Sequence, residues 1–371
     1  MSRLFTPMPV GNLILPNRII VAPMCQYSAV DGCAGDWHMI HLGGLALSGA
    51  GLLTLEATAV SPEGRISQDD LGLYSDSNET ALARILGAIR AHSPMRLAVQ
   101  LAHAGRKASS RAPWDGGKQV HIDEPGGWRA LAPSPVPYAD GEDAPLALDR
   151  AGLVRVRDQF AAAAHRAARL GFDAIEIHGA HGYLLHEFLS PIANRRDDEY
   201  GGSLENRMRF PLEVFDAVRG AFPARSPVWM RISATDWLPN GWDVDEAVAF
   251  SRALQQHGCD AIHVSSAGIS PLQVIKLGPG YQVPFAARIK ADVGLPTIAV
   301  GLITEPEQAE SILAREEADA VSLARAMLYA PRWPWHAAAR LGAHVWAPKQ
   351  YWRCQPREHK DLFESTSFGQ R

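Results

Sequence analysis

Three side chains that can donate protons, His178, His181 and Tyr183, follow one strand-like segment. Residues 174–178 alternate in character, so Glu176 and His178 point to one face and the isoleucines between them to the other. A carboxylate and an imidazole on one face of a strand need polar partners or a function. The spacing therefore indicates a site that binds a polar group and transfers a proton.

Two alternatives for these histidines are a metal site and ordinary hydrogen bonding. An H-x-x-H pair indicates zinc only weakly, and neither an H-E-x-x-H motif nor a cysteine pair accompanies it here. Four scattered cysteines lack C-x-x-C spacing, which predicts free thiols: Cys25, Cys33, Cys259 and Cys354. We therefore expect no metal.

The composition favours a protein that acts on small molecules. Of 371 residues, 47% are apolar, and the formal net charge is −4, so there is ample core and no large cationic surface for nucleic acid. The start of the chain lacks the apolar core of a signal peptide, and no stretch is apolar enough to span a membrane. We expect a soluble, cytoplasmic protein.

Short runs rich in Val, Ile and Ala alternate with amphipathic stretches, which is typical of a parallel sheet wrapped by helices. The predicted strands are 19–22, 52–57, 96–101, 174–178, 228–232, 261–265, 297–301 and 320–323. The predicted helices are 37–48, 78–92, 150–169, 204–221, 245–256, 284–292, 305–314 and 333–341, with Asn78 and Asp149 as N-caps and Gly171 after a helix end.

Eight strands of this kind predict an α/β fold with a single (β/α)8 TIM barrel. The barrel would span residues 1–344 as one domain. Residues 102–148, after the third strand, are rich in Gly, Pro, Trp and Asp and should form a long excursion over the barrel mouth. Residues 345–371 form an extended C-terminal tail.

Polar residues gather where the predicted strands end, and the carboxyl ends of the strands carry the active site in such barrels. Besides His178, His181 and Tyr183, these strand ends hold Cys25, Tyr27, Gln100, Arg231, Gly301, Ala324 and Arg325. Strands seven and eight are where barrels commonly bind phosphate. A phosphorylated ligand is therefore expected.

A series of motifs, in one order along most of the chain, carries a resemblance to a known family. These are residues 4–7 (LFTP), 15–18 (LPNR), 22–27 (APMCQY), 100–106 (QLAHAGR), 178–183 (HGAHGY), 190–196 (SPIANRR) and 198–203 (DEYGGS). With them, the chain resembles the Old Yellow Enzyme family of FMN-dependent ene-reductases. Cys25 and Tyr27 resemble its thermophilic-like branch.

The resemblance implies a site for FMN. It assigns the flavin to the backbone around Ala22, Pro23, Met24 and Cys25, to Ala57, to the Gln100 amide, and to Arg231 beneath the pyrimidine ring, with the phosphate at Gly301, Leu302, Ala324 and Arg325. A guanidinium at that place stabilises reduced flavin. Many relatives have glycine where this chain has Ala324, and strand parity makes Glu176 the expected ionic partner of Arg231.

The resemblance also implies the reaction. NADPH or NADH would reduce FMN, and hydride from flavin N5 would then reach the activated C=C bond of an unsaturated carbonyl or nitro compound. His178 and His181 would donate hydrogen bonds to the substrate oxygen, and Tyr183 would supply the proton. Cys25 would tune the redox potential, and Tyr27 would contact substrate.

In the thermophilic-like branch, an arginine in a similar tail reaches the neighbouring subunit's active site. Arg353, together with Trp352, is therefore expected in trans, in a homodimer or homotetramer. The charged stretch 354–371 is expected to be disordered.

Two other functions stay open at this point. One is a non-redox TIM-barrel enzyme such as a metal-dependent hydrolase, because the fold alone does not decide the chemistry. The other is a flavin reductase for xenobiotic or nitro compounds in a stress response.

Overall fold

Eight parallel strands close into a barrel, as the sequence pattern predicts. The computed structural model describes residues 2–367, and within them the barrel consists of β3 (Ile19–Val21), β4 (Leu52–Ala59), β5 (Arg96–Ala102), β8 (Ala174–Gly179), β9 (Val228–Ser233), β10 (Ile262–Ser265), β11 (Thr297–Ala299) and β12 (Ala320–Leu323). The pairing of β12 with β3 closes the ring. The strands are buried on both faces, as helix-covered parallel sheets are.

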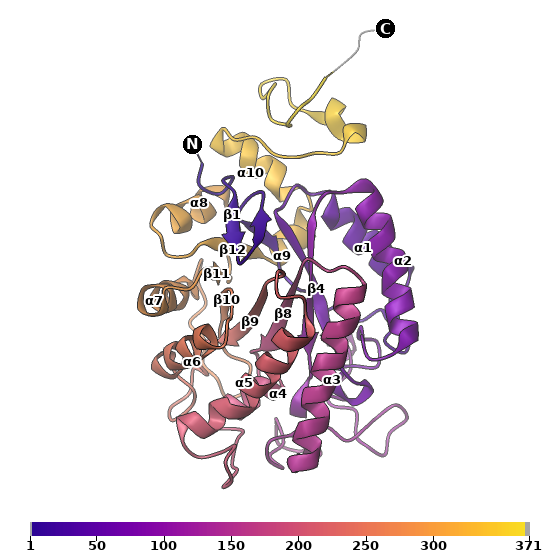
Figure 1. Cartoon of the computed structure of the whole chain (residues 1–371), viewed down its shortest axis with the longest axis vertical. Coiled ribbons are helices and arrows are strands. Elements are labelled where there is room, and N and C mark those ends of the chain that lie inside the picture. The colour runs from indigo at the N-terminus through magenta and orange to yellow at the C-terminus, as the bar shows by residue number, and fades with distance from the viewer. Residues whose placement is uncertain (1, 368–371) are drawn as a thin grey trace.

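The eight expected helices surround this barrel (Figure 1). They are α1 (Asp36–Ala46), α2 (Asp76–His92), α3 (Arg150–Arg169), α5 (Leu204–Ala221), α6 (Val244–Gln256), α7 (Val283–Val293), α8 (Pro306–Ala314) and α10 (Trp333–Leu341). Two short helices were not expected: α4 (Leu184–Leu189), which follows β8 in the chain, and α9 (Arg325–Tyr329), which follows β12. None of the helices in the described residues is long and apolar enough to cross a bilayer.

The helix caps follow the prediction with one correction. Asp149 accepts a hydrogen bond from the Gly152 amide (2.7 Å), and Gly171, with φ +72°, follows α3. The N-cap of α2 is Ser75, whose hydroxyl accepts the Asn78 amide (3.2 Å), so Asn78 was the wrong choice. Its buried side chain instead ties the helix to the preceding loop, donating to the Asp31 carbonyl (3.0 Å).

An N-terminal hairpin covers the end of the barrel away from the mouth. Its strands are β1 (Met8–Val10) and β2 (Leu13–Leu15). The turn at Gly11 lies against Pro227 and Asp260, which stand before β9 and β10. The hairpin was not predicted, because three-residue strands are too short to show alternation.

Residues 102–148 leave the barrel after β5 and lie at the end opposite the hairpin, where they run as purple loops at the bottom of Figure 1. They contain two short 3-10 turns, Gly105–Lys107 and Pro113–Asp115, and a pair of short parallel strands, β6 (Leu131–Ala132) and β7 (Leu146–Ala147).

The C-terminal tail stands with the N-terminus and β1 at the top of Figure 1. The prediction that the tail is disordered beyond residue 354 is wrong for part of that segment. Leu362 and Phe363 are buried, and the Phe363 ring packs on Trp335 (centroids 5.0 Å apart). These two apolar residues hold an otherwise charged segment to the barrel. Residues 368–371, also expected to be disordered, lie outside the described residues.

Candidate active site

The two predicted histidines form a hydrogen-bonded chain at the end of β8. His178 Nδ1 accepts the Ala180 amide (3.2 Å), so its proton is on Nε2, which faces His181 Nδ1 at 3.3 Å. His181 Nε2 then donates to Ser265 Oγ (2.7 Å) on β10. This pattern assigns the Nε2–H tautomer to both rings.

Both imidazoles are neutral at pH 7. Burial, with a smaller contribution from the Arg231 guanidinium, lowers the pKa of His178 and that of His181 well below the ordinary value. Neutral imidazoles with Nε2 protons are hydrogen-bond donors toward an oxygen acceptor.

Tyr183 lies beside His178, at the start of α4. The two rings meet edge to face, with centroids 4.8 Å apart. Burial raises the pKa of Tyr183 well above 10, so the phenol keeps its proton over the physiological range. The structure thus brings His178, His181 and Tyr183 together.

Lys107 is a site residue that the sequence reasoning missed. Its ammonium donates to the His181 carbonyl (2.9 Å) and lies 5.1 Å from the centroid of the Tyr183 ring. Burial lowers the pKa of Lys107 to about 8. Its position directly after the motif 100–106 was the available signal.

Cys25 and Tyr27 lie in the loop after β3. Glu56 on β4 holds this loop by accepting the Gln26 amide (2.8 Å). Burial, then Asp70 and Glu56, raise the pKa of Cys25, so its sulfur is a thiol and not a nucleophilic thiolate. The Tyr27 ring packs edge to face on Trp114 of the excursion, with centroids 5.4 Å apart.

The expected ion pair between Glu176 and Arg231 is wrong. Glu176 accepts hydrogen bonds from Gln100 Nε2 (2.6 Å), Trp229 Nε1 (2.8 Å) and His263 Nδ1 (2.7 Å), which occupy both carboxylate oxygens. Burial opposes the charge, but His263 and Arg231 outweigh it and lower the pKa of Glu176 to about 2. The buried Nε of Arg231 has no partner among the described residues.

A cavity of about 360 Å³ opens at the ends of the strands and gathers six of the predicted site residues. Its lining includes His181, Arg231, Ser322, Gly301, Leu302, Ala324 and Arg325. Gly301 has φ +118°, and a Cβ there would come within 2.7 Å of Gln282 Nε2, so only glycine fits.

The other predicted cofactor residues continue around the barrel mouth on the neighbouring strands. Ala22, Pro23 and Met24 follow β3, and the Ala22 amide is already used by the Leu323 carbonyl (3.0 Å). Ala57 on β4 pairs with Gln100 on β5. Arg353 lies in the tail at Lys349–Cys354, at the far end of the barrel and away from this chain's own mouth (Figure 1).

These residues fit the expected FMN. Two buried polar atoms that line the cavity, Arg231 Nε and Ser322 Oγ, have no protein partner among the described residues, and each needs one. Arg325 is exposed at the rim, where a phosphate would meet a fixed positive charge.

Comparisons with known proteins agree with this picture. Residues 3–343 match the model of the NADH:flavin oxidoreductase / NADH oxidase family. The chain is 43% identical to an NADPH dehydrogenase of Geobacillus thermodenitrificans over 94% of this chain and 98% of the relative, and 44% identical to an NADH:flavin oxidoreductase of Gibberella zeae over 84% and 79%. Among solved structures, morphinone reductase is similar with a TM-score of 0.76 at 28% identity, covering 99% of this chain and 94% of that one.

Proposed function

We propose that this chain, which belongs to the NADH:flavin oxidoreductase / NADH oxidase family, reduces activated C=C bonds of unsaturated carbonyl or nitro compounds. This is the Old Yellow Enzyme family of the sequence motifs, and the chain is an FMN- and NAD(P)H-dependent oxidoreductase. A non-redox hydrolase is set aside, since the family and its named relatives are oxidoreductases.

In this proposal the chain holds FMN across the barrel mouth. Arg231 and Gln100 take the flavin ring, together with the backbone of 22–25 and Ala57. Gly301, Leu302, Ala324 and Arg325 take the phosphate. When bound, FMN supplies the hydride chemistry between NAD(P)H and the alkene. The buried Arg231 Nε, which has no protein partner in the part of the chain that the structure describes, supports this assignment.

His178 and His181 bind the oxygen of the substrate. The contact between the two rings is long (3.3 Å), so a substrate oxygen can replace His181 Nδ1 as the acceptor of the His178 Nε2 proton. His181 offers its own Nε2 proton to the same oxygen when it releases Ser265 Oγ. Hydrogen bonds from neutral imidazoles stabilise the negative charge that develops on this oxygen when the β-carbon accepts hydride.

Tyr183 delivers the proton to the α-carbon. Its phenol is protonated, and its ring contacts His178, which brings the acid beside the group that holds the substrate. Cys25, as a thiol, tunes the flavin, and Tyr27 contacts the substrate. The juxtaposition of two neutral imidazoles and one protonated phenol beside Arg231 is the observation that carries the proposed function.

The site is completed by a neighbouring subunit in this proposal. The tail that contains Arg353 stands at the end of the barrel opposite the mouth of its own chain (Figure 1), so this arginine would reach a mouth in another copy. A homodimer or homotetramer would supply Arg353, together with Trp352, in trans.

The test separates the two half-reactions in the Tyr183→Phe variant. Reduction of the yellow protein by NADPH should proceed at the wild-type rate, because no phenol proton is used. Reoxidation by a cyclic enone should slow by about 10²–10⁴-fold. Stopped-flow flavin absorbance measures both.

Tyr200→Phe is the matched control, because the Tyr200 hydroxyl contacts Glu213 (3.3 Å) outside the site. An unchanged enone rate in Tyr183→Phe would refute the role of the phenol. A wild-type protein that neither binds flavin nor oxidises NADPH with an enone would refute the proposed function itself.

A further inference from the structure

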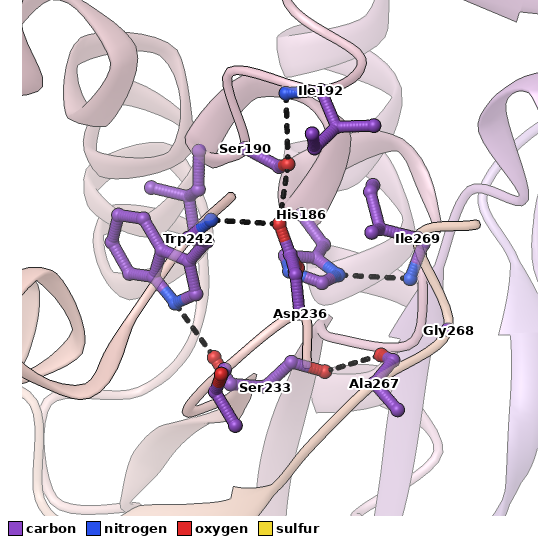
Figure 2. Close-up of polar contacts among 12 residues, drawn as sticks. His186, Ser190, Ile192, Ser233, Asp236, Trp242, Ala267, Gly268 and Ile269 are labelled. Atoms are coloured by element: carbon purple, nitrogen blue, oxygen red, sulfur yellow. Dashed lines mark hydrogen bonds and ion pairs between the residues drawn. The ribbon is translucent and has the colours of Figure 1, made fainter. Parts of the chain in front are cut away.

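A buried histidine–aspartate pair lies directly behind the turn that carries His181 and Tyr183. His186 on α4 and Asp236 after β9 are both fully buried, and His186 Nε2 is 3.0 Å from Asp236 Oδ1 (Figure 2). Neither residue is among those that line the cavity. The chemistry proposed above therefore uses neither of them directly.

The surroundings of Asp236 fix the orientation of its carboxylate. Its Oδ2 accepts two hydrogen bonds, from Ser190 Oγ (2.6 Å) and from the Trp242 amide (2.8 Å), as Figure 2 shows. The other ring nitrogen places the imidazole proton: His186 Nδ1 accepts the Gly182 amide (2.9 Å), so a neutral ring carries its hydrogen on Nε2, facing Oδ1. The Nε2···Oδ1 contact is close but lies off the ideal line of a hydrogen bond, which makes the attraction chiefly electrostatic.

This arrangement selects one tautomer of His186. With its proton on Nε2, the ring presents a lone pair on Nδ1, and that nitrogen accepts the Gly182 amide at 2.9 Å. A proton on Nδ1 would set two donors against each other. The Asp236 carboxylate therefore decides whether the Gly182 amide has an acceptor.

Gly182 is the residue between His181 and Tyr183, and its turn is strained. His181 has φ +59°, in the left-handed region that costs a non-glycine residue free energy, and Gly182 has φ +74°. A Cβ at Gly182 would come within 2.0 Å of the Gly268 carbonyl oxygen. Such a turn persists only where hydrogen bonds over-determine it.

We propose that Asp236 and His186 are positioning residues for the reaction. Asp236 holds His186 in its Nε2–H form, and His186 in turn accepts the Gly182 amide. The turn then fixes the positions of the His181 imidazole and the Tyr183 phenol relative to the substrate. The kinetic consequence rests on the function proposed above, whereas the structural one does not.

Asp236→Asn tests the tautomer without changing the shape of the side chain. The Trp242 amide is a fixed donor, so the amide oxygen of the new residue must face it, which turns the new NH2 group toward His186. The imidazole proton then moves to Nδ1, and the Gly182 amide loses its acceptor. His186→Asn should keep an acceptor for the Gly182 amide, because the side-chain oxygen of the new residue takes the place of Nδ1. This oxygen is an acceptor whatever residue stands at position 236.

We expect Asp236→Asn to slow reoxidation by a cyclic enone by up to about a hundredfold, since a misplacement of about 1 Å costs this much. His186→Asn should retain most of the rate, and Asp236→Asn added to it should cost little more. His186→Leu, which offers no acceptor, should be as slow as Asp236→Asn. The control pair is His257 and Asp216 on the surface (2.7 Å apart), whose Asn variants should match the wild type.

A second readout needs no alkene. Hydrogen exchange of the peptide that covers residues 180–184, in the flavin-loaded protein, should show a protected Gly182 amide in wild type and His186→Asn. The amide should be exposed in Asp236→Asn and His186→Leu. If the wild type reduced no enone but this pattern held, only the proposed function would fail.

Two outcomes would overturn the inference. One is equal cost of Asp236→Asn in the wild-type and His186→Asn backgrounds, which would mean that Asp236 acts on the fold and not through the tautomer. The other is unchanged protection of Gly182 in Asp236→Asn. If that variant did not fold, the same question would be answered by the comparison of His186→Asn with His186→Leu, and equal rates and protection in these two would reject the proposal.

Discussion

Burial decides the protonation of the candidate site at the scale of single residues. It lowers the pKa of His178 and that of His181 well below 6.5, so the protons that would charge the rings bind only in acid. The rate of enone reduction should therefore show no histidine titration between about pH 6 and pH 8. Single-turnover reoxidation across this range measures it. A step with an apparent pKa near 6.5 would show that an imidazolium takes part.

Lys107 predicts a titration at the upper end of this range. Because burial lowers the pKa of Lys107 to about 8, its ammonium is charged below that pH and loses its charge above it. The charged donor holds the His181 carbonyl more strongly than a neutral amine. The enone rate should fall roughly fivefold as pH rises through about 8, which corresponds to about 1 kcal/mol.

Lys107→Met should be slow at every pH and should show no such fall. The pH dependence of folding stability has the opposite sign to that of the enone rate. The lowered pKa means that protonation opposes folding, so the stability contributed by this group declines as pH drops through about 8. An identical pH profile in Lys107→Met would assign the titration to another group.

At the scale of elements, the strands and long helices could be predicted because their periods of two and 3.6 residues repeat often enough to be recognised. The short elements could not, and they matter most for the site. Helix α4 carries His186, and α9 carries Arg325. Five or six residues give too little periodicity for prediction. The N-cap of α2 was assigned wrongly because both Ser75 and Asn78 are residue types that suit a cap. Only the tertiary contact of Asn78 with Asp31 decides between them.

Arg106 joins two elements over the mouth, and the sequence did not reveal this. Its guanidinium donates to the carbonyls of Val136 and Pro137 in the excursion (both 3.3 Å) and of Ile269 after β10 (2.5 Å). Arg106→Met should leave these carbonyls without a donor and lower the free energy of unfolding by about 1–3 kcal/mol. Urea unfolding measures this, and hydrogen exchange should rise first in residues 133–140. Arg157→Met on the surface is the control, and equal losses in both variants would contradict a clamp.

At the scale of the whole molecule, the position of the tail predicts complementation between subunits. Arg353→Ala should impair every site, and so should Tyr183→Phe, but mixed oligomers would contain some sites with an intact Tyr183 and an intact Arg353 from the neighbour. Unfolding and refolding the two variants together should recover up to about a quarter of the wild-type activity of a dimer, if chains pair at random. No recovery, or a fully active wild-type monomer in sedimentation, would rule out a shared site.

The sequence by itself determined the barrel and the family, because strand and helix periods are local and the motifs are specific. It also predicted the residues of the candidate site, because the motifs stand at strand ends, which meet at one face of any such barrel. The tertiary structure alone decided which polar groups meet. Glu176 pairs with His263 and not with Arg231, Lys107 reaches the His181 carbonyl, and Asp236 faces His186. These contacts join residues far apart in the chain, and side-chain reach and competition for each oxygen settle them only when the strands have closed.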